Sequence, residues 1–115
     1  MKNPHPQRGE IWVVQLDPAI GSEIKKTRPA LIISNNAHNR FMGHLTVLPI
    51  SDAGEKVYLV EVFLPAGIAN LTKNSKIRCH QIRTIDKSRF IKPIGSIPQM
   101  YWESIEKALR IHLNF

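Results

Sequence analysis

Two charged turns carry the residues whose types and spacing best suit chemistry. The first, RTID at residues 83–86, follows an apolar run, and the second, KKTRP at residues 25–29, precedes one. Guanidinium and ammonium groups bind phosphate oxygens, a hydroxyl donates to them, and a carboxylate accepts or orients a proton. Together these groups favour a phosphate-binding surface, and they suit the cleavage of RNA.

Cleaving RNA without a metal ion needs a base for the ribose 2′-hydroxyl, a positive group for the phosphate, and an acid for the leaving 5′-oxygen. Arg28 is the leading candidate for the positive group, because its planar guanidinium matches phosphate oxygens. Pro29 keeps residue 28 out of the helical region, at the start of a strand. The alternative is that Arg28 is a solvated loop charge beside Lys25 and Lys26.

Three other candidates lie where expected strands end. Arg83 and Asp86 either form a salt bridge that fixes the turn, or Arg83 holds phosphate while Asp86 accepts a proton or orients Arg83. The Ser51 hydroxyl either donates to a phosphoryl oxygen or simply begins a turn, and Thr84 is expected to cap its turn. The candidate catalytic residues are therefore Arg28, Ser51, Arg83 and Asp86, and the candidate RNA-binding residues are Lys25, Lys26, Thr27, Gln81 and Thr84.

The five histidines and the single cysteine add no second chemistry. A histidine pair is the usual acid–base device of metal-free ribonucleases, but the spacing here supplies neither a local pair nor an HExxH motif. His44 and His80 are the two worth testing, and in a regular strand His80 would point away from Arg83. Cys79 lies in an alternating apolar run and is expected to be a buried thiol. We expect no metal site and no cofactor.

Size and charge narrow the class of protein. A chain of 115 residues predicts one domain over residues 1–115, with residues 1–8 as a flexible lead-in. Sixteen Lys and Arg against nine Asp and Glu give a net charge of +7, which favours a polyanionic partner. No apolar run approaches ~18 residues, so a cytoplasmic protein without membrane contact is expected.

Hydrophobic periodicity predicts five or six short strands followed by one helix. Pro49 in the third strand indicates an edge or a bulge. After Pro98, apolar residues recur at helical spacing, and a proline suits the first turn of a helix. The order predicts a compact, mostly antiparallel barrel closed by a C-terminal helix. Strands are expected at residues 10–16, 30–34, 45–50, 57–64, 75–84 and 90–94, one helical turn at 35–41, weak helix within 65–74, and a turn at 86–89.

Five short motifs follow one another along the chain. They are RGEIW at residues 8–12, DP at 17–18, GSE at 21–23, TRPALIIS at 27–34 and QIRTIDKSR at 81–89. In this combination the sequence resembles the MazF/PemK toxins of bacterial type II toxin–antitoxin systems. The resemblance runs from about residue 8 to the C-terminus.

The resemblance implies a mainly β fold, a small SH3-like, PemK-type antiparallel barrel with a C-terminal helix, assembled as a homodimer. It implies a metal-independent, sequence-selective endoribonuclease that cleaves single-stranded RNA, mainly mRNA. The products would be a 2′,3′-cyclic phosphate and a 5′-hydroxyl. It also implies inhibition by a cognate antitoxin whose disordered tail lies across the RNA site.

The family's motifs also assign residues. Its RP-motif arginine falls on Arg28, and its hydroxyl residue, usually threonine, falls on Ser51. Arg83 and Asp86 match residues proposed as catalytic in some relatives, and His80 stands where many relatives carry an acidic residue. Because a fold alone does not fix function, a non-enzymatic toxin of the same fold that poisons DNA gyrase is the main alternative, and a plain nucleic-acid-binding module is a third.

Overall fold

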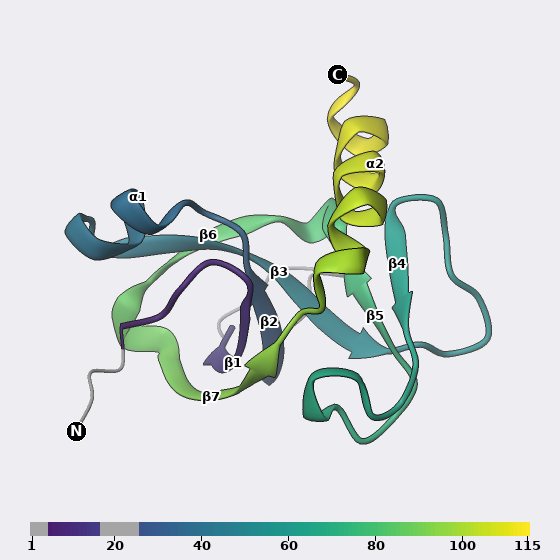
Figure 1. The fold of residues 1–115 in the computed structure, drawn as a ribbon, viewed down its shortest axis with the longest axis horizontal. Coiled ribbons are helices and arrows are strands. Elements are labelled where there is room, and N and C mark those ends of the chain that lie inside the picture. The colour runs from purple at the N-terminus through teal and green to yellow at the C-terminus, as the bar shows by residue number, and fades with distance from the viewer. Residues whose placement is uncertain (1–4, 17–25) are drawn as a thin grey trace.

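The computed structural model describes residues 5–16 and 26–115, which contain seven antiparallel strands in one sheet (Figure 1). The strand order is β4-β5-β3-β2-β1-β7, with β6 paired to β3. Within the described residues β4 and β7 are not paired, so the sheet curls without closing. The predicted β fold with a C-terminal helix is confirmed. The strands are β1 (Glu10–Gln15), β2 (Thr27–Ile32), β3 (His44–Asp52), β4 (Glu61–Leu64), β5 (Ser75–Arg78), β6 (Arg83–Asp86) and β7 (Phe90–Ser96), and the helices are α1 (Asn36–Phe41) and α2 (Trp102–Leu113).

Strand β3 is the interior strand that joins the two halves of the sheet. One of its edges pairs with β2, while its other edge pairs first with β6, through residues 44–47, and then with β5, through residues 50–52. Pro49 therefore does not mark an edge strand, as its type suggested. It lies between the β6 and β5 pairings, where a missing N–H is tolerated.

Two expected strands are shorter than the sequence indicated. Residues 75–84 do not form one strand, because a 3₁₀ turn at Cys79–Gln81 separates β5 from β6. The turn redirects the chain from the last residues of β3 back to its first ones. Residues 57–64 form a strand only in their second half, and Leu59 before it is 79% exposed. In both segments the apolar pattern of a strand continues through a turn.

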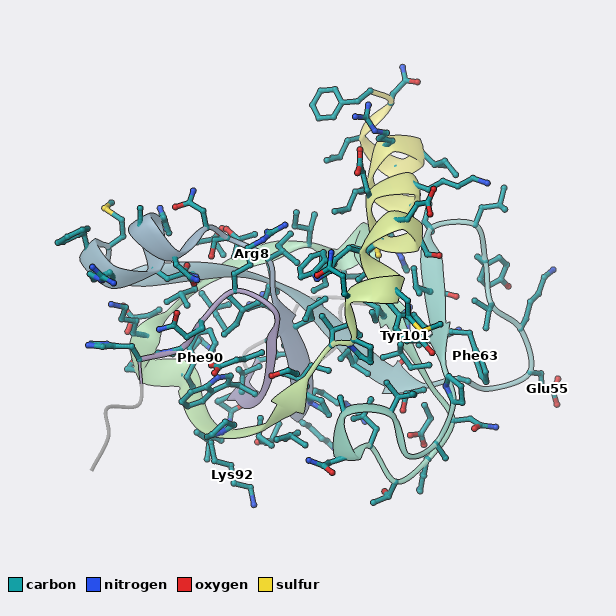
Figure 2. All side chains as sticks on the ribbon, in the orientation of Figure 1. Arg8, Glu55, Phe63, Phe90, Lys92 and Tyr101 are labelled. Atoms are coloured by element: carbon teal, nitrogen blue, oxygen red, sulfur yellow. The ribbon has the colours of Figure 1, made fainter. Side chains whose placement is uncertain are left out.

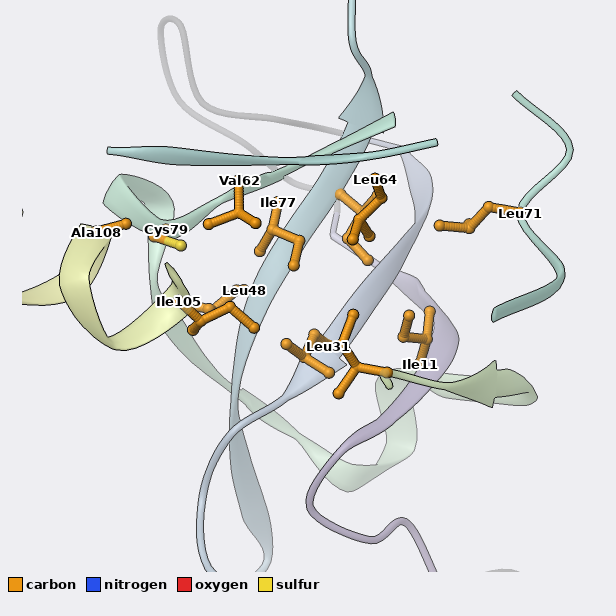
Figure 3. Packing of buried hydrophobic residues seen from close by; sticks show 12 residues of the cluster. Ile11, Leu31, Leu48, Val62, Leu64, Leu71, Ile77, Cys79, Ile105 and Ala108 are labelled. Atoms are coloured by element: carbon orange, nitrogen blue, oxygen red, sulfur yellow. The ribbon is translucent and has the colours of Figure 1, made fainter. Parts of the chain in front are cut away.

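The two faces of the sheet each cover a separate core. The helix-side core packs Ile105 and Ala108 of α2 against Leu48, Ile77 and other buried residues (Figure 3). The opposite, strand-side core consists of Trp12, Val14, Leu16, Ala30, Ile32, Leu45, Val47 and Ile85, with Phe90 against its rim. Alternate residues of one strand point to opposite faces, so β3 supplies both cores.

Helix α2 is attached to the N-terminal lead-in. The Arg8 guanidinium lies 4.3 Å from the centre of the Trp102 ring, and the Arg8 N–H donates to Asn36 Oδ1 at 2.7 Å. Pro6 is buried as well. Pro6 and Arg8 thus contact the rest of the domain, whereas residues 1–4 lie outside the described part. No helix among the described residues is long and apolar enough to cross a membrane.

Candidate functional site

The strand register places Arg28 and Arg83 on the same face of the sheet. Directly opposed residues of an antiparallel pair share a face, and Arg28 opposes Val14 while Arg83 opposes Val47. Both valines belong to the strand-side core. Arg28 is exposed and Arg83 is half-buried, so both guanidinium groups emerge at the margin of that core.

Ser51 shares the face of Arg28 at the end of the β2–β3 pairing. The paired residues of these strands end with Ala30 opposite Pro49, and Arg28 and Ser51 each lie two residues beyond that pair, on the face of Val47. The hydroxyl and the guanidinium therefore lie on one face of neighbouring strands, beyond their last paired residues. On its other side Ser51 opposes Lys76 of β5. A serine between two positive side chains suits the binding of an oxyanion.

Thr84 and Asp86 point to the other face, because they alternate with Arg83 along β6. The Thr84 hydroxyl lies 2.8 Å from that of Thr46. The Asp86 carboxylate accepts a hydrogen bond of 2.8 Å from the Ser88 N–H and caps the following 3₁₀ turn. Hydrogen bonds from Ser88 also lower the pKa of Asp86. The structure therefore brings Arg28, Ser51 and Arg83 to one face, and it separates Asp86 from them.

The remaining predicted RNA-binding residues lie at the ends of elements. Lys26 is exposed and has a φ of 69°, and Thr27, also exposed, begins β2 beside Arg28. Gln81 is half-buried at the end of the 3₁₀ turn that leads to β6. Lys25 lies outside the described residues.

An ion cluster that the sequence did not indicate lies next to Ser51. The Glu61 side chain, only 2% exposed, has its Oε1 3.0 Å from Lys76 Nζ and its Oε2 2.9 Å from Arg78 Nε. Arg78 Nη1 donates a long hydrogen bond of 3.4 Å to Ser51 Oγ. Glu61 and Arg78 are opposed on β4 and β5, so only the pairing of these strands reveals the contact.

The electrostatics of the cluster leave a positive surface. Burial by itself would raise the pKa of Glu61, but the Tyr58 N–H, Lys76 and Arg78 together outweigh burial and lower it. Glu61 is therefore ionised at neutral pH, and two positive groups against one carboxylate leave one net positive charge. We call the surface formed by Arg28, Ser51, Lys76, Arg78 and Arg83 the cationic face.

The cysteine and the two singled-out histidines lie beside the cationic face or behind it. Burial raises the pKa of the Cys79 thiol to about 12, which agrees with the predicted buried thiol. Burial, and then Arg78, lower the pKa of His80, whose ring centre is 6.3 Å from that of His112. His44 opposes Asp86 and therefore lies on the face away from Arg83.

Two hollows border helix α2, and the second of them reaches Glu61 of the ion cluster. A groove of about 690 Å³ runs between Arg8 and helix α2. Phe63 and Tyr101 lie near each other below α2 (Figure 2), where they line a second hollow of about 380 Å³. We place the site on the cationic face, since an extended polyanion is bound by exposed positive side chains rather than in an apolar hollow.

Comparison with known proteins identifies the family. Residues 7–113 match the model of the PemK-like, MazF-like toxin of type II toxin–antitoxin systems. Endoribonuclease MazF9 of Mycobacterium tuberculosis is 38% identical over 113 residues, which cover 94% of this chain and 96% of that protein. Endoribonuclease EndoA of Bacillus subtilis is 33% identical over 108 residues, 93% of each chain.

Solved structures of similar shape agree with this match. MazF from Deinococcus radiodurans superposes with a TM-score of 0.85 at 24% identity, over 98% of this chain and 100% of that one. A mycobacterial endoribonuclease in complex with its cognate antitoxin gives a TM-score of 0.78 at 20% identity, over 96% of each chain. The chain belongs to the PemK-like, MazF-like toxin family of type II toxin–antitoxin systems.

Proposed function

We propose that the chain is a toxin that acts as a metal-independent, sequence-selective endoribonuclease on single-stranded mRNA. Its relatives in Mycobacterium tuberculosis and Bacillus subtilis are named endoribonucleases. The observation that carries the proposal is the face that the exposed Arg28 shares with Ser51 and with three more positive side chains. Single-stranded RNA suits an open face, because its bases can be splayed and read there.

In the proposed reaction the ribose 2′-oxygen attacks phosphorus and the bond to the 5′-oxygen breaks. The products are a 2′,3′-cyclic phosphate and a 5′-hydroxyl. Arg28 stabilises the charge that develops on the phosphoryl oxygens, and the Ser51 hydroxyl donates to one of them. Water at the open face takes the proton from the 2′-hydroxyl and returns one to the 5′-oxygen, since Asp86, the predicted acceptor, points to the opposite face.

Arg83 holds a flanking phosphate in this proposal. It opposes Val47, four residues before Ser51 on β3, which corresponds to about 13 Å along the strand. At that separation one phosphoryl group does not reach both residues. Lys26 and Gln81 would contact RNA further along the same surface, whereas Thr27 alternates with Arg28 along β2 and points to the opposite face. Lys25 stays a predicted RNA-binding residue.

The oligomeric state, the cellular location and the inhibitor are proposed from the family. We propose a homodimer that acts in the cytoplasm, where mRNA is available, and that a cognate antitoxin inhibits. The complex of a mycobacterial endoribonuclease with its cognate antitoxin, which shares this fold, supports the last point.

The test is cleavage of a single-stranded RNA oligonucleotide in EDTA by the wild type, Arg28→Ala and Arg110→Ala. Loss of one charge-stabilising group costs about 10²–10³ in rate, so we expect Arg28→Ala to lose at least ~100-fold. Arg110 lies on α2 and pairs with Glu106 there, and its variant serves as the control with wild-type activity.

The same preparation is assayed for inhibition of DNA gyrase supercoiling. Cleavage by the wild type without gyrase inhibition supports the proposal. Undiminished cleavage by Arg28→Ala, or gyrase inhibition by a wild type that cleaves no RNA, contradicts it.

A further inference from the structure

The ion cluster of β4 and β5 holds Arg78 in one orientation. Arg78 Nε lies 2.9 Å from Glu61 Oε2 in an ion pair without hydrogen-bond geometry, and Nη1, on the other side of the guanidinium, lies 3.4 Å from Ser51 Oγ. The Arg78 side chain is 25% exposed, whereas that of Glu61 is 2% exposed. The carboxylate thus fixes the guanidinium from beneath and leaves one edge accessible from the cationic face.

The need to neutralise the Glu61 carboxylate does not explain the position of Arg78. Lys76 already pairs with Oε1 of the carboxylate at 3.0 Å, and it also donates to the Lys56 carbonyl. The Tyr58 N–H donates to the same Oε1. A buried carboxylate with one close ammonium and a backbone donor is compensated, so Arg78 contributes a positive charge beyond what Glu61 needs.

The contact between Arg78 and Ser51 links this extra positive charge to a hydroxyl of the proposed RNA site. When Arg78 donates to Ser51 Oγ, the hydroxyl oxygen serves as acceptor, and its own hydrogen is free for another oxygen. That hydrogen now points to the Asp52 carbonyl at a long 3.3 Å, a weak contact that a phosphoryl oxygen can replace. Catalytic hydrogen bonds that are long in the free enzyme commonly tighten in the complex with substrate.

We propose that Arg78 is a further phosphate-binding residue of the RNA site, and that Glu61 is the positioning residue that holds Arg78 beside Ser51. The inference rests on the proposed RNA-cleaving function and extends its binding surface across β5. A guanidinium whose rotamer is already fixed loses little further freedom when it binds, and its planar fork suits phosphate oxygens.

The first experiment measures binding without cleavage. The probe is an all-2′-deoxy oligonucleotide, which lacks the attacking hydroxyl, and its dissociation constant is measured over a range of salt concentrations. Each neutralised phosphate of a single strand contributes about 0.7 to the slope of log K against log salt. We expect Arg78→Gln to reduce the slope by about 0.7, and the control Glu106→Gln, which breaks an exposed ion pair on α2, to leave it unchanged.

The second experiment separates the charge of Arg78 from its geometry. Arg78→Lys keeps the charge but cannot bridge Glu61 and Ser51, so we expect the salt slope to be retained while kcat on an RNA oligonucleotide falls about tenfold. This is less than the ~10²–10³ that loss of a whole charge-stabilising group costs, because the lysine keeps its charge. Glu61→Gln should likewise lower kcat and keep the salt slope. In a Ser51→Ala background, Arg78→Lys should change kcat less than twofold, because its effect passes through that hydroxyl.

The outcomes distinguish the inference from the function on which it rests. If the wild type cleaves RNA but Arg78→Gln keeps the wild-type slope and kcat/KM, as Glu106→Gln does, the inference is overturned and the function stands. If the wild type cleaves no RNA, the proposed RNA-cleaving function is contradicted, and with it the inference about Arg78, whatever the salt slopes are. Should Arg78→Gln not fold by circular dichroism, Arg78→Lys decides, and an unchanged kcat in that variant overturns the inference.

Discussion

Replacing Glu61 with glutamine should destabilise the fold in a way that depends on pH. At a separation of about 3 Å and an effective dielectric constant of about 20, each ion pair of Glu61 amounts to ~5 kcal/mol of Coulomb attraction. Desolvation of the charges offsets most of this, and removing one partner of a buried pair typically costs about 3–5 kcal/mol. Because glutamine still accepts the Tyr58 hydrogen bond, we expect a loss of about 3 kcal/mol at pH 7, or ~12 °C in Tm.

The pH dependence follows from the lowered pKa of Glu61. A carboxyl group whose pKa is lowered by folding stabilises the folded state at pH values above its unfolded pKa, near 4.5, and that stabilisation is lost as the pH falls through the folded pKa. The difference in the free energy of unfolding between the wild type and Glu61→Gln should therefore be largest at pH 7 and should shrink below about pH 4.5.

The assay is urea unfolding followed by circular dichroism at pH 7, 5, 4 and 3, at a fixed protein concentration. Glu106→Gln is the matched control, because it also removes a carboxylate from a 2.9 Å ion pair, but its side chain is 64% exposed. Exposed pairs contribute about 0–1 kcal/mol. The role assigned to the buried ion pairs would be refuted if Glu61→Gln and the wild type had the same free energy of unfolding at pH 7, or if their difference were equally large at pH 3.

Two further predictions concern residues outside the cationic face. The Cys79 thiol, with its pKa raised from 9.0 to about 12, should react with a thiol reagent at pH 8 at least ~1000-fold more slowly in the folded protein than in guanidinium chloride, and similar rates in both would contradict its burial. Asp86→Ala removes the cap of a 3₁₀ turn behind the face, so RNA cleavage should stay within about threefold of wild type while Tm falls. A cleavage loss as large as that of Arg28→Ala would instead place Asp86 in the reaction.

Much of the fold could be predicted because the buried strands β1, β2 and β3 carry short apolar runs. β1 and β3 were located to within two residues from alternation and β-branched content, and α2 from its helical spacing. Residues 75–84 could not be divided from the sequence, since the 3₁₀ turn at Cys79–Gln81 keeps Cys79 in the same core as Ile77. A buried residue inside a turn continues the apolar pattern that a strand would show.

The candidate site was readable only where its residues are neighbours in the sequence. Arg28 and Pro29 are adjacent in the sequence, so the pair could be picked out there, although the choice between a phosphate-binding residue and a solvated loop charge needed the family's RP motif. The contact between Glu61 and Arg78 spans 17 positions and exists only through the pairing of β4 with β5. Likewise, the separation of Asp86 from Arg83 depends on β6 being extended at both residues, whereas three-residue spacing in a turn would have let them meet.

Because β3 holds Ser51 and also lines both cores, the position of Ser51 depends on the packing of the same strand. A slip of one residue in β3 would turn every side chain to the opposite face. Cells selected for survival of the toxin should therefore carry changes at Val47 or Leu48 alongside changes at Ser51 itself. Attenuated variants that remain well folded, such as those wanted for an antitoxin-binding assay, are better sought at Arg28, whose exposed side chain has no packing role.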